Sequence, residues 1–167
     1  MSLTVAEAEL PSTNPLDLLE ELVNANEWAH DRASDDELAV EIAGKWCDYH
    51  LFFVWRDDMS ALHFTCMFEA RVPEAKRKEV FHLMALANER LWMGHFELSS
   101  DDGMPMFRHT VPLRGVRAPS VELLEDLVDT AIGESERYFP AFQFVIWGGK
   151  PAAEAMNAAM LDTVGEA

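Results

Sequence analysis

Apolar and polar residues alternate from Glu37 to Glu69, and this alternation predicts three antiparallel strands. Two-residue turns at Gly44-Lys45 and Asp58-Met59 would place nearly every large apolar side chain on one face of the sheet. That face needs a cover of helices. The predicted register pairs Ile42 with Cys47, Val40 with Tyr49, Leu38 with Leu51, Trp55 with Leu62, Phe53 with Phe64, Leu51 with Cys66 and Tyr49 with Phe68.

The second face of these strands is mixed rather than polar. It also carries apolar side chains, namely Trp46, Phe52, Val54 and Met67. An antiparallel sheet commonly leaves one face in water, but apolar residues there indicate partial cover. A second subunit would supply that cover.

One helix is predicted before these three strands and another after them. Asn14 is the N-cap and Pro15 the first residue of one helix, which should end within residues 24–26. Residues 30–36 are polar and are expected to form a connection. Pro73 opens the other helix, whose apolar periodicity continues to about residue 93.

Residues 95–113 predict a second hairpin that turns at Asp102-Gly103. Pro105 and Pro112 indicate that its return strand is short or lies at a sheet edge, because proline cannot donate to a ladder. This register pairs Leu98 with Phe107 and Phe96 with His109.

Pro119 and Ser120 begin the last predicted helix, and Gly148-Gly149 ends it. Pro140 should kink or break it. The segment 138–149 is apolar on more sides than a single core face requires. It either packs into the core on both sides of the kink or forms a dimer seam or a groove for an apolar partner segment.

The order of elements, α-β-β-β-α-β-β-α, is typical of the α+β class, with an antiparallel sheet covered on one face by helices. Three regions are expected. Residues 1–13 form a flexible N-terminal arm, residues 14–150 a single domain, and residues 151–167 a C-terminal tail with a short, weakly held helix.

The charge of the 167-residue chain restricts its partners. Thirty acidic residues against thirteen basic ones give a formal net charge of −17, which disfavours nucleic acid and anionic membranes as partners. No apolar run approaches the length of a membrane span, and the first residues lack the features of a signal peptide. A cytoplasmic location is the expectation.

The sequence offers little for catalysis or for binding metals and cofactors. Cys47 and Cys66 would lie about 13 Å apart in the predicted register, too far for a disulfide. No zinc, phosphate-loop or nucleophile-elbow motif is present, so we predict no catalytic residues, no metal and no cofactor. An enzyme with a dispersed site that uses His50, His63 and nearby acids is a further alternative.

The segment Glu136-Arg137-Tyr138-Phe139-Pro140-Ala141-Phe142, followed by Val145-Ile146-Trp147-Gly148-Gly149, resembles the C-terminal signature of the YbjN family of bacterial sensory transduction regulators. The Asn14-Pro15-Leu16-Asp17 and Asn88-Glu89-Arg90-Leu91 segments are similar too. The resemblance covers residues 14–150 and implies a fold like that of type III secretion chaperones and a binding role. It carries no catalytic residues.

We therefore hypothesise a non-enzymatic regulator or chaperone-like protein that binds an unidentified protein client and acts as a homodimer. The predicted partner or dimer surface consists of Trp46, Phe52, Val54, Met67, Phe142, Phe144 and Trp147. The alternative is a small-molecule sensor domain with a pocket between the sheet and the helices.

Overall fold

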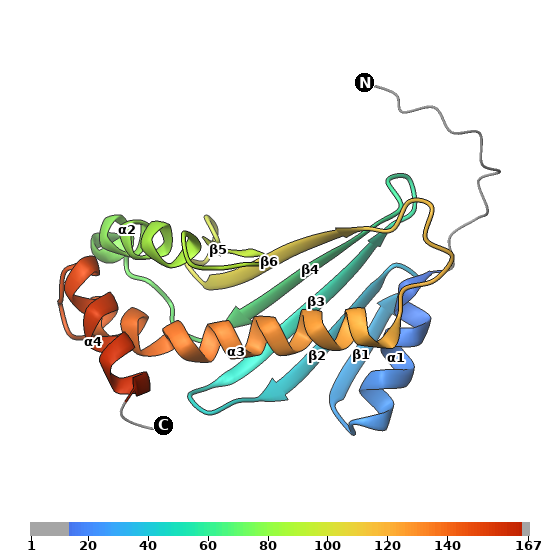
Figure 1. The fold of residues 1–167 in the computed structure, drawn as a ribbon, viewed down its shortest axis with the longest axis horizontal. Helices are drawn as coiled ribbons and strands as arrows, with labels where there is room; N and C mark the ends of the chain where they lie inside the picture. Colours follow the sequence, from blue (N-terminus) through green and yellow to red (C-terminus); the bar gives the residue numbers. More distant parts are fainter. Residues whose placement is uncertain (1–13, 165–167) are drawn as a thin grey trace.

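The computed structural model describes residues 14–164, with side chains described up to Leu161. The predicted N-terminal arm, residues 1–13, lies outside the described residues. The described chain contains one antiparallel sheet in the order β1-β2-β3-β4-β6-β5 (Figure 1). Its strands are β1 (Ala29–Ser34), β2 (Glu37–Ala43), β3 (Asp48–Arg56), β4 (Ala61–Phe68), β5 (His95–Leu98) and β6 (Pro105–Pro112).

The helices gather over one face of this sheet and at one end of it. The long helix α3 crosses the sheet, α1 lies beside its N-terminal part, and α2 and α4 pack together at its other end (Figure 1). The fold is α+β, as predicted. The helices are α1 (Pro15–Ala25), a 3₁₀ turn (Glu74–Lys76), α2 (Arg77–Asn88), α3 (Val121–Ile146) and α4 (Ala152–Val164).

The core forms between the inner sheet face and the helices. The side chains of the predicted strands point to the sheet faces that were predicted for them. The β3–β4 register is confirmed: Trp55 pairs with Leu62, Phe53 with Phe64, Leu51 with Cys66 and Tyr49 with Phe68. Phe53 and Phe64 are both buried, and their ring centroids lie 4.8 Å apart. Apolar side chains on alternate positions thus form one continuous surface for the helices to cover.

The predicted register of the first hairpin is wrong by two residues. Val40 pairs with Leu51 rather than Tyr49, because residues 44–47 form a four-residue loop instead of a two-residue turn. This loop is docked on α3: the Lys45 backbone N–H donates to Glu136 over 2.6 Å. A shift of two keeps every side chain on its predicted face, so the core composition is unaffected.

The predicted register of the second hairpin is also wrong by two residues. Phe96 pairs with Phe107, and Leu98 with Pro105, a shift of two from the prediction. Its loop is held by a hydrogen bond from the Val72 backbone N–H to the Gly103 carbonyl, 2.8 Å long. The return strand β6 is not an edge strand, since it pairs with both β4 and β5. Its two prolines are tolerated because they stand at its first and last positions.

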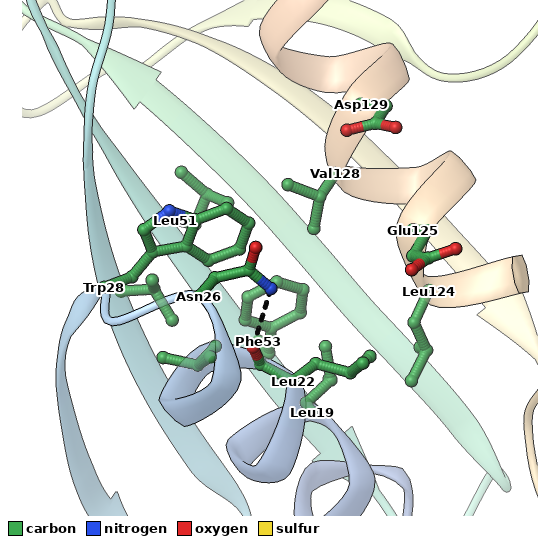
Figure 2. A pocket seen from close by; sticks show the side chains of 12 residues that line it. Leu19, Leu22, Asn26, Trp28, Leu51, Phe53, Leu124, Glu125, Val128 and Asp129 are labelled. Atoms are coloured by element: carbon green, nitrogen blue, oxygen red, sulfur yellow. Dashed lines mark hydrogen bonds between the residues drawn. The ribbon is translucent and has the colours of Figure 1, made fainter. Parts of the chain in front are cut away.

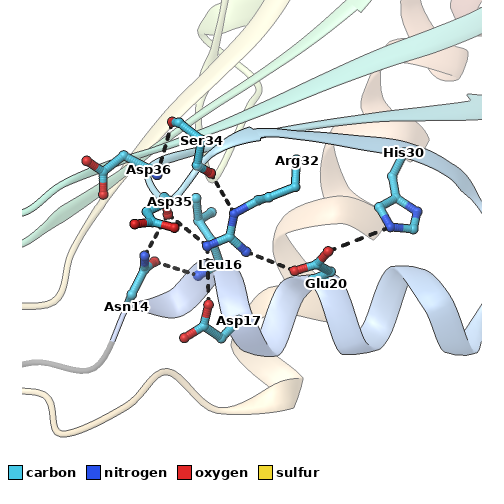
Figure 3. Close-up of polar contacts among 9 residues, drawn as sticks. All are labelled: Asn14, Leu16, Asp17, Glu20, His30, Arg32, Ser34, Asp35 and Asp36. Carbon is cyan, nitrogen blue, oxygen red and sulfur yellow. Dashed lines mark hydrogen bonds and ion pairs between the residues drawn. The ribbon is translucent and has the colours of Figure 1, made fainter.

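The polar segment predicted as a connection contains the edge strand β1. Arg32 on this strand reaches α1, where it pairs with Asp17 over 3.2 Å and Glu20 over 3.1 Å (Figure 3). It also donates to the backbone carbonyls of Ser34 and Asp35, each over 2.8 Å. The strand carries no alternating apolar pattern, and Arg32 joins it to α1 through charge rather than through burial.

Helix α2 ends five residues earlier than predicted. The Asn88 side chain accepts a hydrogen bond from the Phe96 backbone N–H over 2.7 Å and donates to the Phe96 carbonyl over 3.1 Å. These two bonds replace the helical ladder with a link to β5. Residues 89–94 then lead directly into that strand.

Helix α3 runs through Pro140, where a kink or break was predicted. A proline within a helix costs about 3 kcal/mol. Large side chains on both sides of it, including Tyr138, Phe139, Phe142 and Val145, are buried. Burying one such side chain contributes about 1.5–3 kcal/mol, so tertiary packing outweighs the proline.

Candidate functional site

The outer sheet face is the first candidate surface. Among residues 14–164 no helix packs on it, and it carries an apolar strip of Phe52, Val54, Met67 and Met106. Phe52 is 40% exposed, and the other three side chains are partly buried. Met106 was missed by the sequence analysis because only the β4–β6 pairing brings it beside Met67. We call these four residues the outer strip.

Charged groups of both signs surround the outer strip. His50 lies 3.7 Å from Glu41 and 3.5 Å from Glu69, while Arg108 pairs with Glu97 over 3.1 Å. A shallow hollow beside Phe52 is lined by β1, β2 and β3 and has a volume of about 260 Å³. Such exposed ion pairs contribute little to stability.

The other predicted surface residues lie elsewhere. Trp46 is 43% exposed but stacks on Phe139 of α3, with ring centroids 6.1 Å apart and planes 10° apart. It therefore belongs to the helix-covered side of the sheet rather than to the outer strip. Phe142 is fully buried in the core and cannot contribute to a surface in this fold. Its predicted role there is wrong because α3 turns it toward the sheet.

Phe144 and Trp147 lie near the C-terminal end of α3. Phe144 is partly buried, and the Lys150 ammonium lies 5.9 Å from its ring centroid. Trp147 follows the helix as its C-cap residue and is 62% exposed. The seven predicted residues thus do not form one surface: three belong to the outer strip, and four lie along α3 or against it.

A second candidate site is a pocket between α1, α3 and the sheet, with a volume of about 240 Å³ (Figure 2). Its floor includes Leu51 and Phe53 of β3. Leu19, Leu22 and Val23 of α1 form one wall, and Leu124 and Val128 of α3 form the other. We call this cavity the α1–α3 pocket.

The polar groups of the α1–α3 pocket lie at its sides. Asn26 and Trp28 follow α1, and Glu125 and Asp129 stand on α3 across the cavity (Figure 2). The Asn26 side-chain amide donates to the Leu22 carbonyl over 2.8 Å. The local sequence pattern holds only an indirect signal for this pocket, because its walls come from segments about a hundred residues apart.

Both walls are fixed by local sequence signals. The Asn14 side chain accepts the Leu16 N–H over 2.9 Å and donates to the Asp35 carbonyl over 2.7 Å, so it caps α1 and ties it to the β1–β2 turn (Figure 3). Ser120 caps α3 by accepting the Leu123 N–H over 3.1 Å. These caps determine where α1 and α3 begin, and the Arg32 ion pairs hold α1 against β1.

The titratable groups give no sign of a nucleophile. Burial raises the pKa of the Cys66 thiol to about 12, and burial also raises the pKa of Cys47. A thiol that stays protonated is a poor nucleophile. Both cysteines are free, as predicted. His50 and His63 point to the outer face but from different cross-strand rows, opposite Met67 and Val54.

Within the described part of the chain, no group of three or more histidine, cysteine, aspartate or glutamate side chains is placed to hold a metal ion. No helix among these residues has the length and apolar character needed to cross a membrane.

A single antiparallel sheet with helices on one face defines a small α+β domain. The model of the YbjN family, described as a putative bacterial sensory transduction regulator, matches residues 15–144. The chain therefore belongs to the YbjN family. No curated protein sequence matches it.

The fold is also that of a solved family structure. The crystal structure of YbjN, a putative transcription regulator from E. coli, superposes with a TM-score of 0.52. The match covers 76% of this chain and 88% of the E. coli chain at 9% sequence identity. At this identity the likeness concerns the fold alone.

Proposed function

We propose that this protein is a non-enzymatic cytoplasmic regulator that acts by binding another protein, in the manner of a chaperone, and that it forms a homodimer. The observation that carries the proposal is the outer strip, an apolar surface on a sheet face that no described helix covers. Soluble monomers rarely leave large contiguous apolar patches in water. The family description of a sensory transduction regulator supports the same role.

A second copy of this chain is a suitable cover for the outer strip. In a two-fold interface each residue meets the same patch of the other copy, so the patch must be complementary to itself. The outer face has an apolar centre around Phe52 and both charge signs around it, with Arg108 on one side and Glu41 on the other. A two-fold rotation can bring such opposite charges together.

The solution mass tests this proposal. We expect the wild-type chain of 18.9 kDa to have twice that mass by light scattering at micromolar concentration. Phe52→Asp should make it monomeric, because a carboxylate would be buried without a partner. Phe81→Asp is the matched control, since Phe81 is 55% exposed on α2, away from the outer face. A wild type that is already monomeric would contradict the proposed dimer.

A small-molecule sensor is the second candidate, and the α1–α3 pocket is the observation in its favour. Its volume of about 240 Å³ is smaller than the roughly 300–1,000 Å³ of most ligand pockets. A metabolite screen by thermal shift separates the two candidates. One compound with saturable stabilisation would favour the sensor.

A further inference from the structure

We propose that the α1–α3 pocket is a docking site for one large apolar side chain of a partner protein, carried next to a lysine or arginine that pairs with Glu125 and Asp129. This inference deepens the proposed protein-binding function and rests on it. It assigns the partner's chemistry: an apolar and basic segment. It uses a different face of the molecule from the outer strip.

The interior of the pocket suits an apolar side chain. The floor and both walls are aliphatic or aromatic, from Leu51 and Phe53 below to Leu22 and Val128 at the sides. An apolar cavity of about 150 Å³ is large enough to hold benzene. A volume of about 240 Å³ therefore accepts a leucine, methionine or phenylalanine side chain.

The charges at one side of the pocket indicate the chemistry of the partner residue next to the side chain that enters it. Glu125 and Asp129 are four residues apart on α3, so they lie on the same side of the helix and repel each other. Neither side-chain carboxylate makes a hydrogen bond or ion pair with the side chains described up to Leu161 or with the described backbone. A basic side chain above the pocket would relieve this repulsion while its neighbour enters the cavity.

The position of the polar groups favours a protein segment over a small molecule. Asn26, Glu125 and Asp129 are exposed residues at the sides of the pocket, while the floor consists of apolar side chains (Figure 2). A small ligand enclosed in the cavity would need polar contacts within it for orientation. A side chain on a peptide is oriented by its own backbone outside. An anionic nucleic acid or membrane would be repelled by the two carboxylates.

A second copy of this chain is a poor occupant of the same pocket. The whole chain has thirteen lysines and arginines against thirty acidic residues, so two copies repel each other over most of their surfaces. The outer strip with its mixed charges avoids this repulsion. The α1–α3 pocket does not, because its charged residues are both acidic.

Fluorescence anisotropy with two labelled twelve-residue peptides tests the inference on the full-length protein. One peptide contains leucine and lysine, the other leucine and glutamate at the same positions. We expect saturable binding of the leucine–lysine peptide only, weakening as salt rises from about 10 to 150 mM because the ion pairs are screened. Absence of binding at millimolar concentration would overturn the inference.

Matched double variants separate the pocket from general attraction between an acidic protein and a basic peptide. Glu125→Gln with Asp129→Asn should weaken binding about five- to tenfold, since two exposed ion pairs are lost. Glu122→Gln with Asp126→Asn removes the same charge at the same spacing on α3, on exposed residues outside the pocket lining. It should change binding less than twofold. Equal weakening of peptide binding by the two double variants would overturn the inference.

The apolar contribution is tested by Leu22→Gln, which changes one wall without changing the charge. Binding should weaken by about tenfold, and circular dichroism should show the wild-type fold because Leu22 is only partly buried. Phe52→Asp should bind the leucine–lysine peptide as the wild type does. A normal dimer with no pocket-dependent peptide binding would refute this inference alone, whereas a monomer with such binding would refute only the homodimer.

Discussion

At the scale of single residues, burial of titratable groups determines how this protein responds to alkaline pH. The Cys66 thiol lies at the centre of the sheet opposite Leu51 and is fully buried. Burial disfavours the thiolate and raises the thiol pKa to about 12. The pKa values of Tyr49 and Tyr138 are raised by burial as well. Each of these groups keeps its proton in the folded state when the unfolded chain would lose it.

We expect the free energy of unfolding to fall as pH rises from 9 to 11. Below pH 9 the Cys66 thiol is protonated in both states, whereas above pH 9 only the unfolded state releases the proton. The free energy of unfolding then falls by up to about 1.4 kcal/mol per pH unit for each such group, until the pH reaches the pKa of the folded state. Urea unfolding at several pH values measures this slope. Cys66→Ala should make the slope shallower, and an unchanged slope would contradict the argument.

At the scale of elements, α3 links the parts of the fold. Its N-cap determines where it begins, and its buried side packs on the sheet. Its N-terminal part forms one wall of the α1–α3 pocket. Gly133 lies within it although glycine is a poor helix former. A Cβ at Gly133 would meet nothing within 4 Å. The glycine therefore weakens the helix without serving its packing.

Gly133→Ala should stabilise the protein by about 0.5–1 kcal/mol, because alanine loses less conformational entropy in a helix. Gly94→Ala is the opposing control. Gly94 has a φ of +69°, and an added Cβ would lie 2.2 Å from the Phe107 ring. That change should destabilise the protein by about 1–3 kcal/mol. Chemical denaturation measures both, and a destabilised Gly133→Ala would show that the helix needs this glycine.

At the scale of the whole molecule, a net charge of −17 opposes the compact state. Ion pairs such as those of Arg32 with Asp17 and Glu20 remove only part of this repulsion. The remaining repulsion acts over longer distances than any single contact and depends on the surrounding salt.

The thermal midpoint should therefore rise when NaCl is raised from about 10 to 150 mM, by about 2–4 °C for each 1 kcal/mol of screened repulsion. Differential scanning calorimetry measures this shift. The double variant Glu122→Gln with Asp126→Asn, which carries two fewer negative charges, should show a smaller shift. A midpoint that falls or stays constant with salt would contradict the argument.

The sequence of this chain determined the face of each residue in the strands that it predicted, and the starts of two helices. Alternation with period two placed Phe53 and Phe64 together in the core whether or not the turn lengths were right. Asn14 and Ser120 marked helix starts because their side chains satisfy free backbone N–H groups. These signals are local, so they can be recognised in the sequence without knowledge of the rest of the fold.

Only the tertiary structure decided the loop lengths, the edge strand β1 and the candidate sites. The first hairpin loop is set by contacts with α3, and β1 is held by Arg32 through α1. Phe142 and Phe144 lie in the same apolar segment, yet Phe142 is fully buried and Phe144 only partly buried. The α1–α3 pocket joins Leu22 to Val128. Such outcomes depend on which distant segments meet, and hydrophobic pattern alone carries no information on that choice.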